Sequence, residues 1–354
     1  MSDKSAIFNG SVSRRGLIKM TVAAGALIAA PAYIRPAWAQ AKRLVVVNSG
    51  GTMGDARRAA LYDPFTAATG IEIITVSGPE LAKIKIQVEH GSVEWDVSDI
   101  SEAGLPIATR ENLLEPIDES IVDLSQIVAK ARKANAVGGT IYAGGIAFPT
   151  DRLKPISNWT EFWDVENFPG RRGLRTRIND TLEIALMADG VPANEVYPCD
   201  IERAFRALER IKPNVSHWIG QTAQTVALIQ ANETDYTFTY TTRVKDMQEA
   251  GVPIDYSFKQ NLLGISWLGV PRGSKMKDEA MQFLNFSLNK ERQTKLANLS
   301  GDAGTNPESL AGVNADVRRW LPDVGSKGNL FVSGAWWADN LEELTVRYKE
   351  WLLT

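Results

Sequence analysis

The sequence predicts an α/β protein of two lobes, and three observations support this prediction. Strand and helix patterns alternate along the early part of the chain, which is typical of a mainly parallel sheet with helices on both faces. The chain has 354 residues, which is more than one hydrophobic core usually supports. Its composition, with 44% hydrophobic and 23% charged residues, is that of a globular protein rather than a disordered or fibrous one.

The first forty residues have the pattern of an export signal. The adjacent Arg14 and Arg15 precede an apolar run over 20–30, and Ala37-Trp38-Ala39 places small residues at the cleavage positions. A basic start, a short apolar middle and an A-x-A end are typical of a cleaved signal, and paired arginines favour the twin-arginine route. We therefore expect residues 1–39 to be a twin-arginine signal peptide and the mature chain to be periplasmic.

The elements of the first lobe follow in chain order. A β-branched run at 44–47 predicts a buried strand, and apolar residues at helical spacing over Asp55–Thr69 predict a helix that Gly70 ends. The other elements expected in this part are a strand at 71–76, a helix at 79–90 and a strand at 93–100. We expect residues 40–148 to form the first part of lobe 1.

A change in composition after the β-rich stretch Thr140–Phe148 marks the second lobe. Pro149, Pro155 and Trp159 follow this stretch, and helical patterns then dominate. The elements expected here are helices at 161–163, 180–189, 200–211 and 221–231 and a strand at 234–241. We expect residues 149–262 to form lobe 2.

The remaining residues, 263–354, are expected to return to lobe 1 with the C-terminal helices. The apolar run Leu262–Val270 predicts a strand, and Asp278–Leu299 predicts one long helix. Thr305-Asn306-Pro307 predicts a turn, and apolar spacing over Trp336–Leu353 predicts an amphipathic terminal helix.

The sequence lacks the motifs of the common enzyme, cofactor and metal sites. His90 and His217 are its two histidines, and neither has a partner at metal-ligand spacing. Zinc-protease, C-x-x-C, phosphate-loop and nucleophile-elbow patterns are absent from it. Cys199 is its one cysteine and is interpreted as a packing residue. A formal net charge of −3 argues against a broad basic surface for nucleic acid. We therefore expect a binding protein without a cofactor, not an enzyme.

Several segments in the same order resemble one family. They are the stretch 50–71 with Gly50-Gly51-Thr52, Trp95-Asp96-Val97, Leu113–Asp118, and the tail with Thr305-Asn306-Pro307 and Trp336–Glu343. Together they resemble the extracellular solute-binding proteins of ABC importers, near the spermidine/putrescine-binding branch. The resemblance implies a periplasmic binding protein fold of type II, with two lobes, crossing hinge strands near 148–152 and 260–266, and a ligand cleft between the lobes.

The resemblance also implies a function. The chain is expected to act as a monomer that captures a small, amine-bearing, polyamine-like solute and delivers it to the permease subunits of an ABC transporter in the membrane. Ligand contacts to both lobes would favour the closed form. No catalytic residue, metal or cofactor is expected.

In lobe 1, the candidate ligand-binding residues follow strand ends. Thr52 comes after the first strand and beside a helix N-terminus, and its alternative role is an ordinary turn residue. Ser101 and Glu102 follow the third strand and match polar contacts of the family, with Asp99 just before them. The alternative for this acidic group is a solvated loop.

In lobe 2, the candidates are Asp180, Glu183 and Tyr240. The two acids stand three residues apart on one side of a helical turn and match acids that grip ammonium groups in polyamine binders. Their alternative role is a capping box at the start of a helix. Tyr240 matches an aromatic residue that packs on the ligand and contributes a face for an ammonium group. Its alternative role is core packing, and Trp218 is a weaker candidate of the same kind.

One departure from the branch concerns Ser266. Polyamine binders carry a Trp-x-Asp pattern on the strand that returns to lobe 1, whereas this chain has Gly264-Ile265-Ser266. The missing carboxylate removes one clamp for ammonium and puts a long diamine held at both ends in doubt. A smaller or amino-acid-like amine fits as well.

Two alternatives remain open at this point. A ferric-ion receptor of the same fold would need paired tyrosinates, and Tyr236 and Tyr240 stand four apart on a predicted strand. A carboxylate-based enzyme on this scaffold would have to use the acids at 180 and 183, for which the sequence offers no general base or metal cluster.

Overall fold

A computed structural model describes residues 42–48, 50–78 and 80–354. The expected signal peptide lies outside these residues. No helix in the described part of the chain combines the length and the apolar character that crossing a bilayer requires. Strands and helices alternate in it, and the α/β class expected from the sequence is confirmed.

Lobe 1 is built around parallel strands. β1 (Arg43–Asn48) lies between β2 (Glu72–Ser77) and β3 (Val97–Ile100), parallel to both. The helices that pack on them are α1 (Gly51–Arg57), a π-helical turn (Arg58–Tyr62), α2 (Asp63–Thr69), α3 (Leu81–Glu89), α4 (Gly104–Arg110), α10 (Lys277–Leu288) and α11 (Lys290–Ser300). The strands end at one edge, where polar side chains gather.

Lobe 2 repeats this plan with β6 (Arg172–Arg175) between β7 (Val215–Ile219) and β8 (Tyr236–Tyr240), again parallel. Its helices are α5 (Trp159–Trp163), α6 (Thr181–Ala188), α7 (Ile201–Ile211), α8 (Thr222–Gln230) and α9 (Thr241–Glu249). The sequence did not predict β6, β7 or α9, because the strands are short and α9 carries few apolar residues.

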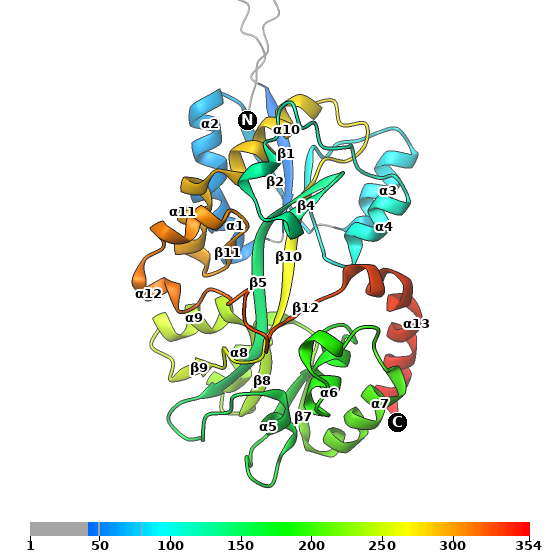
Figure 1. The fold of residues 1–354 in the computed structure, drawn as a ribbon, viewed down its shortest axis with the longest axis vertical. Helices are drawn as coiled ribbons and strands as arrows, with labels where there is room; N and C mark the ends of the chain where they lie inside the picture. The colour runs from blue at the N-terminus through cyan, green and yellow to red at the C-terminus, as the bar shows by residue number, and fades with distance from the viewer. Residues whose placement is uncertain (1–41, 49, 79) are drawn as a thin grey trace, which may run out of the picture. The chain divides into compact units, whose positions relative to one another are not determined.

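Two long antiparallel strands connect the lobes (Figure 1): β5 (Ala136–Pro149) and β10 (Leu262–Gly269). Together they complete the sheet order β2-β1-β3-β10-β5-β8-β6-β7. The short strands β4 (Arg132–Lys133), β9 (Ile254–Tyr256) and β11 (Ala303–Gly304) pair with β5, and β12 (Leu330–Phe331) pairs with β10.

The crossing on β5 lies earlier than expected. Ala143 belongs to the core of lobe 1 and Ile146 to the core of lobe 2, so the chain crosses before the predicted hinge at 148–152. On β10 the change falls between Leu262 and Leu263, inside the predicted range 260–266. β5 is one uninterrupted strand across the crossing, so no change in composition indicates where the chain passes from lobe 1 to lobe 2.

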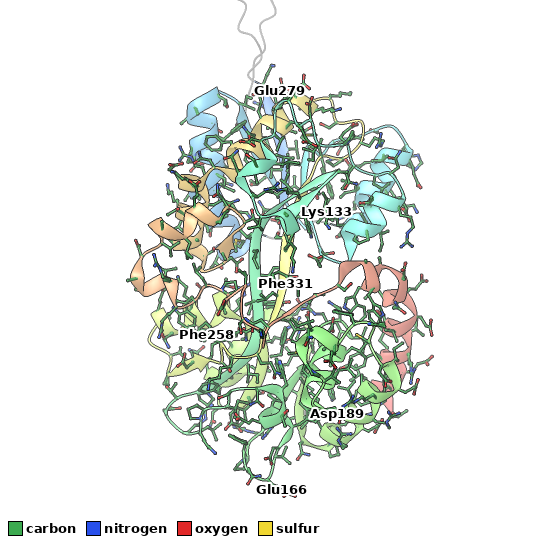
Figure 2. All side chains as sticks on the ribbon, in the orientation of Figure 1. Lys133, Glu166, Asp189, Phe258, Glu279 and Phe331 are labelled. Atoms are coloured by element: carbon green, nitrogen blue, oxygen red, sulfur yellow. The ribbon has the colours of Figure 1, made fainter. Side chains whose placement is uncertain are left out.

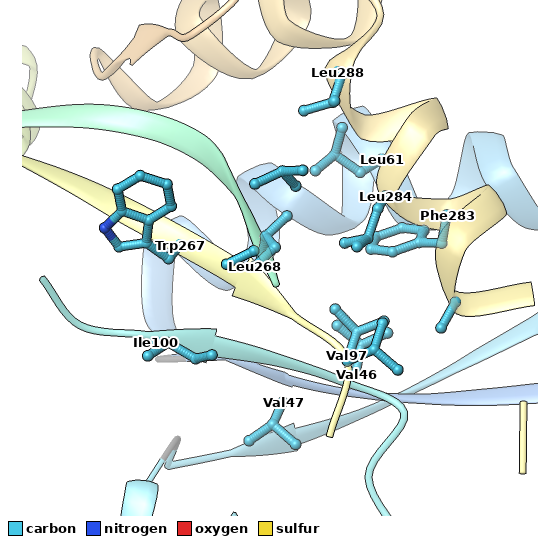
Figure 3. Packing of buried hydrophobic residues seen from close by; sticks show 14 of the residues in the cluster. Val46, Val47, Leu61, Val97, Ile100, Trp267, Leu268, Phe283, Leu284 and Leu288 are labelled. Carbon is cyan, nitrogen blue, oxygen red and sulfur yellow. The ribbon is translucent and has the colours of Figure 1, made fainter. Parts of the chain in front are cut away.

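The core of lobe 1 joins residues that are far apart in sequence (Figure 3). Val46 and Val97 from neighbouring strands pack with Leu268 of β10 and with Phe283 and Leu284 of α10. The predicted helix at 278–299 is interrupted: Asn289 is extended between α10 and α11, and its side chain accepts a hydrogen bond from the backbone of Glu291. The packing of Phe283 and Leu284 against the strands holds this part of the chain in lobe 1.

The terminal helix α13 (Gly334–Leu353) does not return to lobe 1 as a whole. Trp337, Leu344 and Tyr348 are buried in the core of lobe 2, and the Tyr348 hydroxyl donates to the backbone oxygen of Arg175 at 2.9 Å. Its first turn remains beside α4 of lobe 1, where Arg110 pairs with Asp339. The aromatic face of α13 finds its apolar partners in lobe 2, which corrects the boundary expected for 263–354.

Candidate functional site

A cavity of about 400 Å³ lies between the lobes. Its walls come from the strand ends of lobe 1, the crossing strands, and the starts of α8 and α9 in lobe 2. The lining residues are Met53, Arg57, Leu81, Ile84, Asp99, Ile100, Ser101, Gly104, Thr140, Tyr142, Thr222, Tyr240, Thr242, Arg243, Ile265, Ser266 and Asp302. A cavity of this size suits a small organic solute.

A buried ion pair forms the lobe 1 wall. Arg57 at the end of α1 pairs with Oδ2 of Asp99 on β3, and both side chains are almost fully buried. The second guanidinium nitrogen of Arg57 donates to the Ser266 hydroxyl at 3.1 Å. Oδ1 of Asp99 has no hydrogen-bond partner in the described structure. A buried carboxylate oxygen without a partner is unusual, and a ligand donor that reached it would satisfy it.

Asp302 adds a second carboxylate to the same wall. It follows α11 and Gly301, it is 5% exposed, and its Oδ1 also lacks a partner among the described residues. Burial raises the pKa of Asp302 to about 7, although the positive charge of Arg57 opposes the shift. A cationic ligand group would relieve the cost of ionising this buried carboxylate.

Two tyrosines form the aromatic part of the cavity. Tyr142 on β5 and Tyr240 at the end of β8 meet edge to face, with ring centroids 5.7 Å apart. Gly264 on β10 makes room for Tyr142, because a Cβ atom there would lie 2.2 Å from the tyrosine hydroxyl oxygen. Burial, followed by the negative charge of Asp180, raises the pKa of Tyr240 to about 12. Both rings therefore remain neutral donors at physiological pH.

Lobe 2 contributes positive charge. Arg243 in the first turn of α9 lines the cavity beside Thr242, and it forms no ion pair with any described residue. Behind this wall, the buried Arg175 donates to the hydroxyl of the lining residue Thr222 at 3.3 Å, while its Nε and Nη1 lack partners there. Arg177 bonds to both Asp180 and Tyr240. An anionic ligand group on this side would meet the guanidinium group of Arg243.

The structure brings together three of the residues predicted from the sequence and places the others elsewhere. Ser101, Tyr240 and Ser266 line the cavity. Asp180 lies one layer behind, where its Oδ2 accepts a hydrogen bond from the Tyr240 hydroxyl at 3.5 Å. Thr52 is exposed in α1 and stands outside the lining.

Glu102 faces away from the cavity. Its Oε2 accepts hydrogen bonds from the backbone of Ile265 at 3.2 Å and from the Trp267 indole at 2.9 Å. Ser101 and Glu102 both lie in the turn after β3, and only Ser101 lines the cavity. Glu102 therefore ties β3 to β10 behind the cavity.

Glu183 is fully buried in lobe 2 and does not reach the cavity. Its Oε1 accepts bonds from the Tyr197 hydroxyl and from the Trp337 indole of α13, the latter at 2.6 Å. Neither acid caps the backbone: Asp180 makes no capping bond at the start of α6. Because α6 is buried on all sides, the two acids share a helix turn without sharing an environment, so neither the paired grip nor the capping box predicted for them is formed.

Sequence reasoning missed the lining residues Tyr142, Thr222 and Thr242, and it also missed three charged ones. Arg57, Arg243 and Asp302 come from helix ends and a loop, where charged residues are ordinarily solvated. The one feature that could have indicated them is their position, because each lies at the end or the start of a helix that faces the cleft. Long-range packing alone distinguishes them from surface charges.

The paired tyrosinates of a ferric site are not assembled. Tyr236 is buried in lobe 2, and its hydroxyl donates to the backbone oxygen of Lys154 at 2.8 Å. Only Tyr240 of the pair lines the cavity. Within the described residues, no cluster of three His, Cys, Asp or Glu side chains has metal-binding geometry.

Comparisons with known proteins find relatives that match most of the chain. Residues 60–320 match the family model of bacterial extracellular solute-binding proteins. A gamma-aminobutyric acid-binding protein of Pseudomonas aeruginosa is 29% identical over 330 residues, which are 90% of this chain and 94% of that protein. A spermidine/putrescine-binding periplasmic protein of Haemophilus influenzae is 24% identical, over 75% of this chain and 81% of its own. The crystal structure of an ABC transporter substrate-binding protein from Bradyrhizobium japonicum is 28% identical, with a TM-score of 0.83 over 88% of this chain and all of that one.

Proposed function

Because the chain belongs to the family of bacterial extracellular solute-binding proteins, we propose that its cavity captures a small zwitterionic solute that carries an ammonium group and a carboxylate. The protein is a substrate-binding component of an ABC transporter, and its family is one of solute receptors rather than enzymes. The comparisons confirm the binding protein fold and the relationship to the polyamine-binding branch that were expected from the sequence. The choice of solute is the proposal.

Lobe 1 supports an ammonium subsite. Asp99 and Asp302 line the cavity, and each has one buried carboxylate oxygen without a partner among the described residues. Tyr142 and Tyr240 add aromatic surface nearby, and a cation near an aromatic face gains about 0.5–2 kcal/mol, depending on its desolvation. An ammonium group has donors for both carboxylates and is attracted by their charge.

Lobe 2 supports a carboxylate subsite. Arg243 and the hydroxyl-bearing side chains of Thr222 and Thr242 line this side of the cavity. A guanidinium group binds a carboxylate with paired hydrogen bonds, and threonine hydroxyls can add single ones. The two subsites belong to different lobes, so one solute would hold both lobes together.

The charge balance of the cavity carries the proposal. Arg57 and Arg243 are its lining cations, and Asp99 and Asp302 its lining anions. The formal charges of these four side chains sum to zero, and a zwitterion leaves that sum unchanged. A diamine would instead place two positive charges in a cavity that already contains two guanidinium groups. The amine-bearing solute expected from the sequence is thereby narrowed from a polyamine to an amino acid with separated ends, such as gamma-aminobutyric acid.

Delivery to a membrane permease and export complete the proposed role. Closure around the solute presents both lobes of a monomeric receptor in a fixed arrangement, which a permease can distinguish from the open one.

Residues 1–39 direct export by the twin-arginine route. Replacing Arg14 and Arg15 by lysine should leave the precursor in the cytoplasm, and periplasmic accumulation of that variant would contradict this part of the proposal.

Binding calorimetry of the mature protein tests the solute class. Gamma-aminobutyric acid, n-butylamine, putrescine and butyrate share a four-carbon body and differ in their end groups. We expect the zwitterion to bind most tightly. We expect Arg243→Gln to weaken it by about 10–100-fold, because a hydrogen bond to a charged group is lost, while n-butylamine binding is unchanged. Preferential binding of putrescine, or an equal effect of Arg243→Gln on both ligands, would refute the zwitterion assignment and leave the receptor role intact.

A further inference from the structure

A second cavity lies behind the hinge. It has a volume of about 350 Å³ and is lined largely by apolar side chains, among them Val128, Ile141, Leu310, Val324 and Phe331. Three of these, Val128, Leu310 and Val324, are among the few large apolar side chains that the described structure leaves exposed. We call this cavity the hinge groove.

The hinge groove lies on the opposite face of the crossing strands from the solute cavity. On β5, Ile141 lines the groove, whereas its neighbours Thr140 and Tyr142 line the solute cavity. Figure 2 shows Phe331 beside the strands where they cross between the lobes. Ile265 of β10 lines both cavities and forms part of the wall between them.

The walls of the groove are ordered by backbone pairing on both crossing strands. Ala303 of β11 pairs with Ile141 of β5, and Phe331 of β12 pairs with Leu263 of β10. The floor is therefore a formed surface rather than a gap between loops. Such a surface is exposed apolar area that a ligand can cover with a gain of roughly 25 cal/mol per Å².

One charged residue lines the groove. The ammonium nitrogen of Lys130 lies 3.7 Å from the centroid of the Phe331 ring, and Lys130 has no ion-pair partner among the described residues. The ring holds the cation beside the apolar lining. The groove thus combines an apolar body with a single positive charge, which is complementary to an amphipathic anion.

We propose that the hinge groove is a second binding site, and that its ligand is a medium-chain monocarboxylate. The acyl chain would cover Leu310, Val324 and Val128, and the carboxylate would pair with Lys130. The proposal is argued from the residues of the groove, so it does not depend on the function proposed above.

Octanoate is the test ligand, and it is titrated into the full mature protein by calorimetry. We expect saturable binding of one octanoate per chain. Octylammonium, which reverses the head charge, should bind at least about fivefold more weakly, because it loses one ion pair and meets a like charge. Equal binding of the two amphiphiles, or binding that does not saturate, would overturn the proposal.

Matched variants locate the site. Leu310→Asp should weaken octanoate at least about tenfold, because it places a carboxylate in the apolar lining. Leu299→Asp is the control, since Leu299 is 44% exposed on α11 outside the groove and Leu310 is 49% exposed. Lys130→Gln should weaken octanoate about fivefold, and the control Lys295→Gln should not.

Two results would reject this assignment. One is an equal loss in Leu299→Asp and Leu310→Asp. The other is a concentration-dependent dimer that Leu310→Asp abolishes, because a second copy of the chain would then be the occupant.

Discussion

Arg57 and Asp99 form an ion pair that is buried on both sides, yet it lies in the wall of the solute cavity rather than inside a lobe core. The pair uses one oxygen of Asp99 and leaves the other without a partner in the described structure. Arg57 thus holds Asp99 in place beside the proposed ammonium subsite. The same two residues therefore contribute to the stability of the fold and to the ammonium subsite.

The first prediction concerns this pair. Asp99→Ala should lower the free energy of unfolding by about 3 kcal/mol, because it leaves a buried guanidinium without its partner. The double variant Arg57→Met with Asp99→Leu should recover most of that loss, because apolar side chains of similar size replace both charges. Chemical denaturation measures both. A double variant no more stable than Asp99→Ala would show that the pair does not act as a unit.

The second prediction concerns the pH dependence of binding. The solute ammonium requires Asp302 to be ionised, and burial raises the pKa of this carboxyl group to about 7. Affinity should therefore fall as the pH drops below 7, approaching about tenfold per pH unit, and level off above it. Asp302→Asn should weaken binding at pH 8 by about 10–100-fold and abolish this dependence. Calorimetry between pH 5.5 and 8.5 checks it, and an unchanged profile in the variant would exclude Asp302 from the subsite.

The third prediction concerns stability rather than binding. Burial, followed by the negative charge of Asp180, raises the pKa of Glu183 in the folded protein from 4.5 to about 7. Between these values the folded protein holds the proton more tightly than the unfolded chain, so the unfolding free energy falls as the pH rises. Relative to Glu183→Gln, the wild type should lose on the order of 2 kcal/mol between pH 4.5 and 7.5. Parallel curves for the two proteins in denaturation experiments would contradict the assignment.

The fourth prediction couples the two cavities. In this structure α9 approaches lobe 1 through Lys245, which lies beside Gly301. The hinge groove is formed in the same arrangement, and a segment that includes Trp320 and Leu330 links its wall to lobe 2. Octanoate should therefore tighten the binding of gamma-aminobutyric acid by about fivefold, and the solute should tighten octanoate equally. Calorimetry with each ligand in excess measures both, and unequal effects would rule out simple coupling.

The sequence predicted what depends on local pattern. Ser101 was expected in the cleft because it follows a strand that ends at the open edge of the sheet, and the family resemblance pointed to Tyr240 and Ser266. Arg57, Arg243 and Asp302 were missed because nothing in their neighbourhoods separates a cleft charge from a solvated one. Their burial follows from contacts between segments far apart in the chain.

The errors have the same origin. The three-residue spacing of Asp180 and Glu183 fixes their common side of a helix turn but not what that side packs against. The terminal helix was expected in lobe 1, but the apolar partners of its Trp337 belong to lobe 2. A terminal amphipathic helix packs on the lobe that offers apolar partners for its aromatic face, and here that lobe is lobe 2.

The segment between α12 (Ala315–Arg318) and β12 has a consequence for how the lobes move. Trp320 is embedded among lobe 2 side chains, and the backbone of Leu330 donates to Asn261 at 2.8 Å, so this segment runs between the lobes alongside β5 and β10. Parallel connections resist torsion about their common direction much more than they resist flexing across it. Opening and shutting should thus follow one nearly fixed trajectory, and solutes of different length would be accommodated by side-chain rotamers and water rather than by a graded angle.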